Sequence, residues 1–182
     1  MEEIDLRKFT FPMSNDNTVM GQMYELVEQS FRYWRDAGLL RVNDTRSFGV
    51  VAKIVAEDKL GELDFNRPES LVDFAILYGD EGGRYAANAL RKLRAAARTG
   101  QSTQDMQKWP ALFQDVVAES DLAMERDGGP IPWGDFPYAG AVILRRNDVC
   151  YLVAVSGFTE KEDHWLATLL AEFLALKNES AE

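Results

Sequence analysis

An aspartate and a histidine stand side by side where a strand is predicted to give way to a helix. Asp163 and His164 follow the turn Ser156-Gly157, and His164 is the single histidine of the 182 residues. An imidazole changes charge near neutral pH and can also bind a metal. Because neighbouring helical residues point about 100° apart, Asp163 and His164 cannot both face one ligand squarely. A packing or hydrogen-bonding role for His164 is the competing interpretation.

A strand hairpin and a helix are predicted to position this pair. Two apolar runs separated by Arg146-Asn147-Asp148 fill residues 138–156, as expected of a hairpin. Thr159 and Glu162 have the spacing of a capping box, which predicts a helix from there to about Lys177. The end of a strand, a glycine turn and the start of a helix gather backbone N–H groups around a small volume. We therefore expect one edge of any small-molecule site at this junction.

Arginines repeat along another predicted helix, at residues 84–99. Arg84, Arg91 and Arg98 are seven residues apart, and Arg94 lies on the same side. A guanidinium pairs with a carboxylate through two parallel hydrogen bonds, so this stripe could hold an acidic ligand. A solvated helix face or a contact between subunits is the simpler interpretation, and we favour it here.

Other residues that could do chemistry fit less well. Ser156 lacks the Gly-x-Ser-x-Gly turn of serine hydrolases, and the helix dipole explains the acids Glu160 and Glu162. The single cysteine, Cys150, lies in an apolar run and is expected to be a buried, unreactive thiol. The glycines of residues 79–83 match neither phosphate-binding motif. One histidine cannot make a structural zinc site, so no metal site is predicted.

The charge balance limits the partners. Asp and Glu number 30 against 20 Lys and Arg, and the formal net charge of −10 disfavours nucleic acid and anionic membrane surfaces. No apolar run approaches the roughly 18 residues of a membrane span, and the first five residues do not resemble a signal peptide. We therefore expect a cytoplasmic protein that binds neither nucleic acid nor membranes.

The order of the predicted elements indicates one α+β domain. Tight turns between strands favour an antiparallel sheet. Thr103 is expected to cap a further helix, in which Pro110 is tolerable only near the first turn. The N-terminal arm is assigned to 1–17, the domain to 18–178 and a tail to 179–182. Helices are expected at 18–37, 84–99, 103–117 and 160–177, and strands at 48–56, from 63, at 71–78 and in the hairpin.

Two motifs resemble a known family. Residues 155–164, Val-Ser-Gly-Phe-Thr-Glu-Lys-Glu-Asp-His, preceded by a hairpin with Gly140, are similar to the C-terminal signature of GlcG/HbpS-like proteins, often labelled haem-degrading or haem-binding. The likeness is nearest to an uncharacterised branch that reads Val-Ser-Gly-Leu-x-x-x-Glu-Asp-His. Residues 90–103 resemble that family's helix, Arg-Lys-x-x-x-x-x-Arg-x-Gly-x-Ser-Ser/Thr. The two motifs have the family's order and separation.

The resemblance implies a profilin-like α+β domain, a central antiparallel sheet flanked by helices, that forms homo-oligomers. It also implies a site for haem or another small anionic ligand. In that site Arg91 and Lys92 would meet propionates or another carboxylate. His164 would approach the iron, or only stabilise the start of its helix. Carried over by position, the site residues are Arg91, Lys92, Gly140, Ser156, Gly157, Asp163 and His164.

Three functions follow as hypotheses. The first is an oligomeric module that binds a small anionic ligand, haem being the named candidate and no catalysis being expected. The second is a ligand-free interaction scaffold, which exposed Trp109 or Trp133 in an apolar patch would favour. The third is an enzyme acting on a small hydroxy or keto acid with His164 or Asp163 as general base, which would require a titrating group with a perturbed pKa in a pocket.

Overall fold

The computed structural model describes residues 19–36, 47–127 and 134–179. The predicted N-terminal arm and Trp133 lie outside these ranges. Along the chain the elements are α1 (Val19–Asp36), β1 (Phe48–Ala56), the 3-10 helices η2 (Glu57–Glu62) and η3 (Pro68–Leu71), β2 (Phe74–Tyr78), α2 (Gly82–Thr99), α3 (Thr103–Met106), α4 (Pro110–Asp127), β3 (Ala141–Arg146), β4 (Val149–Ser156) and α5 (Glu160–Glu179).

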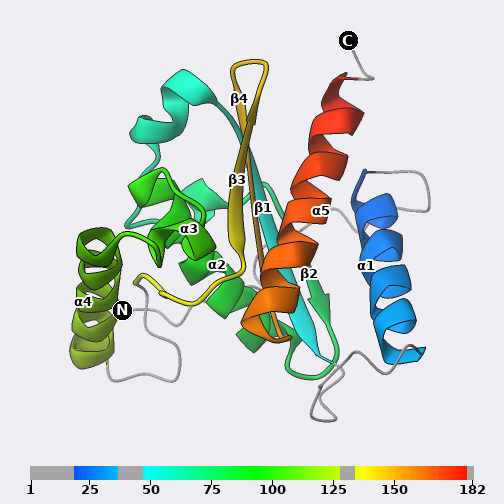
Figure 1. Cartoon of the computed structure of the whole chain (residues 1–182), viewed down its shortest axis with the longest axis horizontal. Coiled ribbons are helices and arrows are strands. Elements are labelled where there is room, and N and C mark those ends of the chain that lie inside the picture. The colour runs from blue at the N-terminus through cyan, green and yellow to red at the C-terminus, as the bar shows by residue number, and fades with distance from the viewer. Residues whose placement is uncertain (1–18, 37–46, 128–133, 180–182) are drawn as a thin grey trace.

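The four strands form one antiparallel sheet in the order β2-β1-β4-β3 (Figure 1). β3 and β4 are the predicted hairpin, and its turn residues Asn147 and Asp148 both have positive φ, of 51° and 58°. This pattern is the tight two-residue turn that matches the twist of two antiparallel strands. The predicted α+β architecture, an antiparallel sheet flanked by helices, is confirmed.

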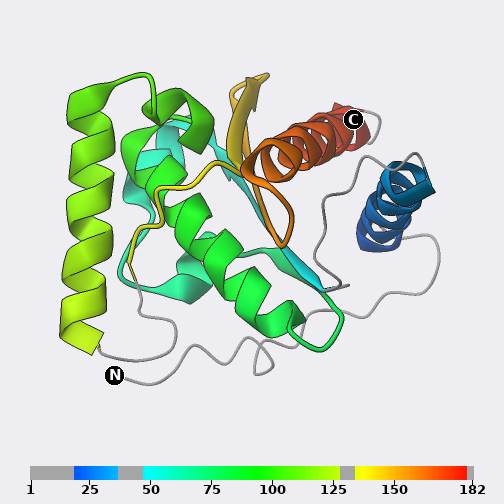
Figure 2. The same ribbon diagram turned by 60° about the horizontal axis from the view of Figure 1, so that its bottom comes forward.

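Helices cover both faces of the sheet (Figure 2). Alternate residues of a strand point to opposite faces, so β1 and β4 contribute to two separate cores. Val51, Leu152 and Ala154 pack under α2, whereas Val50 and Val153 pack under α1 and α5. The alanines of α2 allow this helix to lie very close to the sheet.

The contact is closest at Gly49 of β1. A Cβ placed on Gly49 would lie 2.0 Å from the backbone nitrogen of Ala86, so only glycine fits beneath the helix. The predicted burial of Cys150 is confirmed, since the residue is fully buried in the α2 core. Burial raises the pKa of its thiol, which disfavours the reactive thiolate.

Two predicted elements differ from the structure. The strand expected from Leu63 is wrong, because that stretch forms a turn followed by the 3-10 helix at Pro68, and β2 begins only at Phe74. The helix expected at 103–117 is two helices, a single turn (α3) and then α4, which has Pro110 as its first residue. A proline has no N–H to donate and therefore suits the first position of a helix.

The predicted cap at Thr103 is also wrong, since Ser102 precedes the helix and makes no side-chain cap. Both hydroxyls instead cover the outer edge of β3. Thr103 Oγ1 accepts the Ala141 N–H at 2.9 Å and donates to its carbonyl at 3.2 Å, and Ser102 Oγ accepts the Ile143 N–H at 3.1 Å. The Ser-Thr end of the family-like motif therefore satisfies backbone groups of β3 at the edge of the sheet.

Candidate functional site

Four parts of the chain meet at one end of the sheet. They are α2, the end of β4, the start of α5 and residues 134–140, which we call the strap. Figure 2 shows the strap, in yellow, crossing α2 on its way into β3. The charged side chains that α2 directs at the strap and at α5 are nearly all buried.

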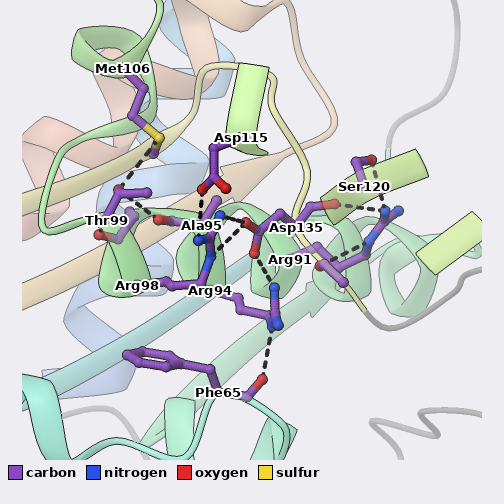
Figure 3. Close-up of polar contacts among 12 residues, drawn as sticks. Phe65, Arg91, Arg94, Ala95, Arg98, Thr99, Met106, Asp115, Ser120 and Asp135 are labelled. Atoms are coloured by element: carbon purple, nitrogen blue, oxygen red, sulfur yellow. Dashed lines mark hydrogen bonds and ion pairs between the residues drawn. The ribbon is translucent and has the colours of Figure 1, made fainter. Parts of the chain in front are cut away.

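Two arginines of α2 hold the strap through the carboxylate of a single aspartate, Asp135 (Figure 3). Asp135 is fully buried, and its carboxylate is bound by Arg94 Nη1 and by Arg98, whose Nη2 is 2.6 Å from Oδ2. Arg98 also pairs with Asp115 of α4 at 2.8 Å. Burial alone would lower the pKa of Arg98, but its bonds to both aspartates raise it. Arg94 and Arg98 thus form an internal clamp between α2, α4 and the strap.

Arg91 contacts the strap differently, through neutral acceptors. Its Nε donates to the Gly134 carbonyl at 3.3 Å, and its Nη2 donates to the Asp135 carbonyl at 2.8 Å and to Ser120 Oγ at 3.4 Å. The guanidinium also lies over the Phe136 ring, 4.9 Å from its centroid. Burial lowers the pKa of Arg91 to about 10, against the opposing effect of nearby Asp135. The solvated helix face that we favoured from the sequence is therefore wrong for Arg91.

The solvated face is also wrong for Arg94, which is buried, whereas Arg84 is exposed. Arg94 additionally donates from Nε to the Phe65 carbonyl at 2.8 Å, so it secures the turn that replaces the expected second strand. From Arg91 onward, the arginines of α2 therefore make contacts inside the protein.

Lys92 reaches from α2 to the start of α5, beside Gly140 of the strap. Its Nζ lies 2.7 Å from Asp163 Oδ2 and 3.1 Å from the Val155 carbonyl, and both charged side chains are 3% exposed. Asp163 Oδ1 accepts the Phe158 N–H at 3.1 Å. Burial raises the pKa of Asp163 to about 6, although Lys92 and the Phe158 N–H both favour the ionised form.

Two glycines allow these parts to approach. Gly140 and Gly157 have φ of 131° and 133°, a region that residues with a side chain rarely adopt. A Cβ on Gly140 would lie 2.8 Å from both Lys92 Nζ and the Asp163 Cβ, and one on Gly157 would meet Phe48 at 2.8 Å. The structure thus brings Lys92, Gly140 and Asp163 into direct contact.

The other two expected site residues lie beside this contact. Ser156 is buried at the end of β4, next to Gly157. His164 is half-buried, and its Nδ1 is a buried atom without a hydrogen-bond partner among the described residues. Burial lowers the pKa of His164, while Asp105 raises it and Lys108 lowers it further. His164 therefore lies on the α3 side of α5, and Asp163 faces α2.

A third polar contact joins the strap to α3 and α5. Glu160 Oε2 accepts the Ala139 N–H at 3.1 Å and the Gln107 Nε2–H at 3.2 Å. The predicted capping box forms as well, with Thr159 N–H donating to Glu162 Oε2 at 3.0 Å and Glu162 N–H to Thr159 Oγ1 at 3.4 Å. The start of α5 is fixed both within the helix and against its neighbours.

The sequence analysis missed Asp135, the carboxylate on which the clamp depends. It lies in a loop rich in glycine, proline and aspartate, where an acid is usually exposed, and 41 residues separate it from Arg94. The one available signal was indirect: several arginines on one face of a largely apolar helix require a counter-charge.

In the described ranges no three His, Cys, Asp or Glu side chains are grouped to hold a metal. None of the described helices is long and apolar enough to cross a membrane.

Several solved structures are similar to this chain. No family model matches the chain, and no curated protein matches it. Klebsiella pneumoniae protein ORFY, a DUF336 protein, is 15% identical to this chain, with a TM-score of 0.47. The match covers 90% of this chain and 97% of ORFY. HbpS of Streptomyces reticuli, solved as a double mutant, is 14% identical, with coverages of 96% and 97% and a TM-score of 0.48. Protein Ybr137w is 18% identical, with coverages of 92% and 82% and a TM-score of 0.44.

HbpS is one of the proteins after which the family resembled by the sequence is named. Likenesses at these identities and TM-scores carry no argument about ligand or activity. Any function must therefore be argued from the chain's own residues.

Proposed function

We propose that the chain is a homo-oligomeric protein that binds a small anionic ligand, with haem as the named candidate. The observation that supports this is the environment of Arg91. Among the described residues, its acceptors are two backbone carbonyls and one hydroxyl, with no carboxylate. A buried cation that contacts no carboxylate directly is costly, and a ligand carboxylate would supply such a contact through the fork of the guanidinium.

The local charge count points the same way. In the described part of the chain, α2 presents four cations to this region, and three of them contact carboxylates, whereas the contacts of Arg91 are to carbonyls and a hydroxyl. The cations are Arg91, Lys92, Arg94 and Arg98, and the carboxylates are Asp115, Asp135 and Asp163.

Two side chains, those of His164 and Arg91, have the chemistry that haem binding would require. Burial lowers the pKa of His164, so its imidazole is neutral at pH 7, as a metal ligand must be. Arg91 has the chemistry to pair with a propionate. Lys92 is already bonded to the Val155 carbonyl and neutralised by Asp163, so it offers a ligand no unpaired positive charge. When bound, haem would supply a redox-active iron, while Arg91 and His164 would orient it.

Titration of the apoprotein with haemin, followed at the Soret band, tests this proposal. We expect a saturable, stoichiometric shift whose position changes in His164→Ala. Thr168→Ala is the matched control, because Thr168 is exposed one turn further along α5 and its hydroxyl contacts only the His164 carbonyl. A spectrum that stays that of free haem would remove haem as the ligand.

A second function, an interaction scaffold, is favoured by exposed aromatic side chains. Trp109 is 63% exposed, Trp165 51% and Tyr138 50%. Large exposed aromatics are enriched where proteins meet partners. If the assembly itself is the functional unit, Trp109→Ser should lower the mass measured by light scattering without changing haemin binding.

Catalysis on a small hydroxy or keto acid is the weaker proposal. Asp163 does have a perturbed pKa, as a general base often has. Its side chain is only 3% exposed, however, and both of its oxygens already accept hydrogen bonds, so it is poorly placed to reach a substrate. A general base must reach the proton that it removes.

A further inference from the structure

Arg91, to which the proposed ligand binds, lies under an aromatic cover. The residue is 3% exposed, and its Cζ lies 4.9 Å from the centroid of the Phe136 ring. Phe136 is itself half-buried, and Tyr138 packs edge-on against it, with 4.8 Å between the two ring centroids. Tyr138 is 50% exposed. Because exposure rises from Arg91 through Phe136 to Tyr138, the Phe136 ring lies on the solvent side of the guanidinium.

One nitrogen of Arg91 is left for a ligand. Nε and Nη2 donate to the carbonyls of Gly134 and Asp135 and to Ser120 Oγ, whereas Nη1 has no acceptor in the part of the chain that the structure describes. Buried donors are normally paired, so Nη1 is the position at which a carboxylate would add most. Since the arginine is buried, a ligand reaches Nη1 only after part of the cover has moved.

The backbone of the strap is held on both sides of this cover. Before it, the Asp135 carboxylate is bound by two arginines of α2 (Figure 3). After it, the Ala139 N–H donates to Glu160 at 3.1 Å. Residues 136–138 lie between these anchors and are half-buried or exposed, and Pro137 in their middle has a fixed φ. The side chains at 136 and 138 can therefore move without breaking either anchor.

We propose that Phe136 is a gate at Arg91: its ring turns away from the guanidinium to admit a ligand carboxylate to Nη1 and returns when the ligand leaves. The gate rests on the proposed function, because it takes Arg91 as the anchor of the ligand. Without a ligand the closed position is favoured, since a cation is attracted to the face of an aromatic ring. A carboxylate is a stronger partner for the same cation, so a bound ligand keeps the gate open.

Reaction of the apoprotein with phenylglyoxal, which modifies accessible guanidinium groups, tests the gate without any ligand. In Phe136→Ala we expect the modification rate of Arg91, followed by peptide mass spectrometry, to rise roughly fivefold, the factor that corresponds to the loss of a cation–π contact. Arg98 of the same helix should keep its rate, because its bonds to Asp135 remain. An unchanged rate at Arg91 would overturn the gate. An equal rise at Arg98 would also overturn it, because the whole strap would then have loosened.

Phe173→Ala is the matched control. The Phe173 ring makes a cation–π contact on α5, with its centroid 5.5 Å from Lys177 Nζ, and its removal should leave the modification rate of Arg91 unchanged. Phe136→Leu keeps most of the bulk of the side chain without the face of the ring, and it serves if Phe136→Ala does not fold. The rise at Arg91 should then be smaller but present, and its absence would contradict the gate.

Stopped-flow mixing with haemin separates the gate from the proposed function. If both hold, haemin associates roughly fivefold faster with Phe136→Ala than with the unmodified protein, because a larger fraction of the molecules is open. Association at an unchanged rate contradicts the gate and leaves haemin binding in place. Absence of haemin binding contradicts the proposed function, and the phenylglyoxal result then decides the gate by itself.

Discussion

The Nζ of Lys92 occupies the space that a side chain at Gly140 would need. A Cβ placed on Gly140 would lie 2.8 Å from Lys92 Nζ and 2.7 Å from the Val155 carbonyl oxygen. The glycine of the hairpin and the lysine of the helix, two parts of the family-like motifs, are therefore one structural feature. Neither can change without disturbing the other.

Gly140→Ala should destabilise the fold by about 2–4 kcal/mol, because the alanine meets both a steric clash and an unfavourable φ of 131°. Urea unfolding followed by circular dichroism measures the loss. Gly61→Ala is the control, since a Cβ there meets nothing within 4 Å. Equal, small effects of the two changes would show that the strap yields easily and that the close packing is unimportant.

Asp135→Asn should cost about 3 kcal/mol of unfolding free energy. The substitution leaves the buried Arg94 and the partly buried Arg98 without their shared counter-charge. Asp115→Asn also removes a partner of Arg98, but Asp115 is 55% exposed, and a loss of under about 1 kcal/mol is expected. The same unfolding assay compares the two. Similar losses would mean that Arg98 alone, and not the buried cluster, stabilises the strap.

Thr103→Val should destabilise the protein by about 1–3 kcal/mol, because the buried Ala141 N–H and carbonyl both lose their partner. Thr168→Val makes the same chemical change at an exposed helical position and should stay within about 0.5 kcal/mol. If Thr103→Val were as mild, the edge of β3 would have another source of protection.

His164 should make stability fall in acid. Burial lowers its pKa in the folded state, so its contribution is present above the ordinary value of 6.5 and is lost as the pH falls through the folded pKa. Asp163 acts with the opposite sign over an overlapping range. The unfolding free energy of the unmodified protein minus that of His164→Gln therefore isolates the histidine. This difference should decline steadily from pH 7 to pH 5, and a flat difference would show that His164 is solvated.

Features that depend on residues close together in the chain were predicted well from the sequence. The Thr159–Glu162 capping box and the end of α2 at Gly100, which has a φ of 69°, are local features and form as expected. The strand expected from Leu63 failed because Pro68 and the long-range bond from Arg94 to Phe65 override local preference.

The charged site required partners that lie far apart in sequence. Lys92 and Asp163 are separated by 71 residues and Arg98 and Asp135 by 37. The resemblance placed both Lys92 and Asp163 among the expected site residues. It did not indicate that the two would neutralise one another, because burial and contact are properties of the fold alone.

Binding of haemin and of iron-free protoporphyrin, measured side by side, tests the ligand proposal most directly. Both carry two propionates, and only haemin carries iron. If Arg91 anchors a carboxylate and His164 meets the iron, both compounds bind stoichiometrically. Arg91→Gln then weakens both, whereas His164→Ala weakens haemin alone. Failure of both compounds to bind, or binding that neither substitution alters, would contradict the account.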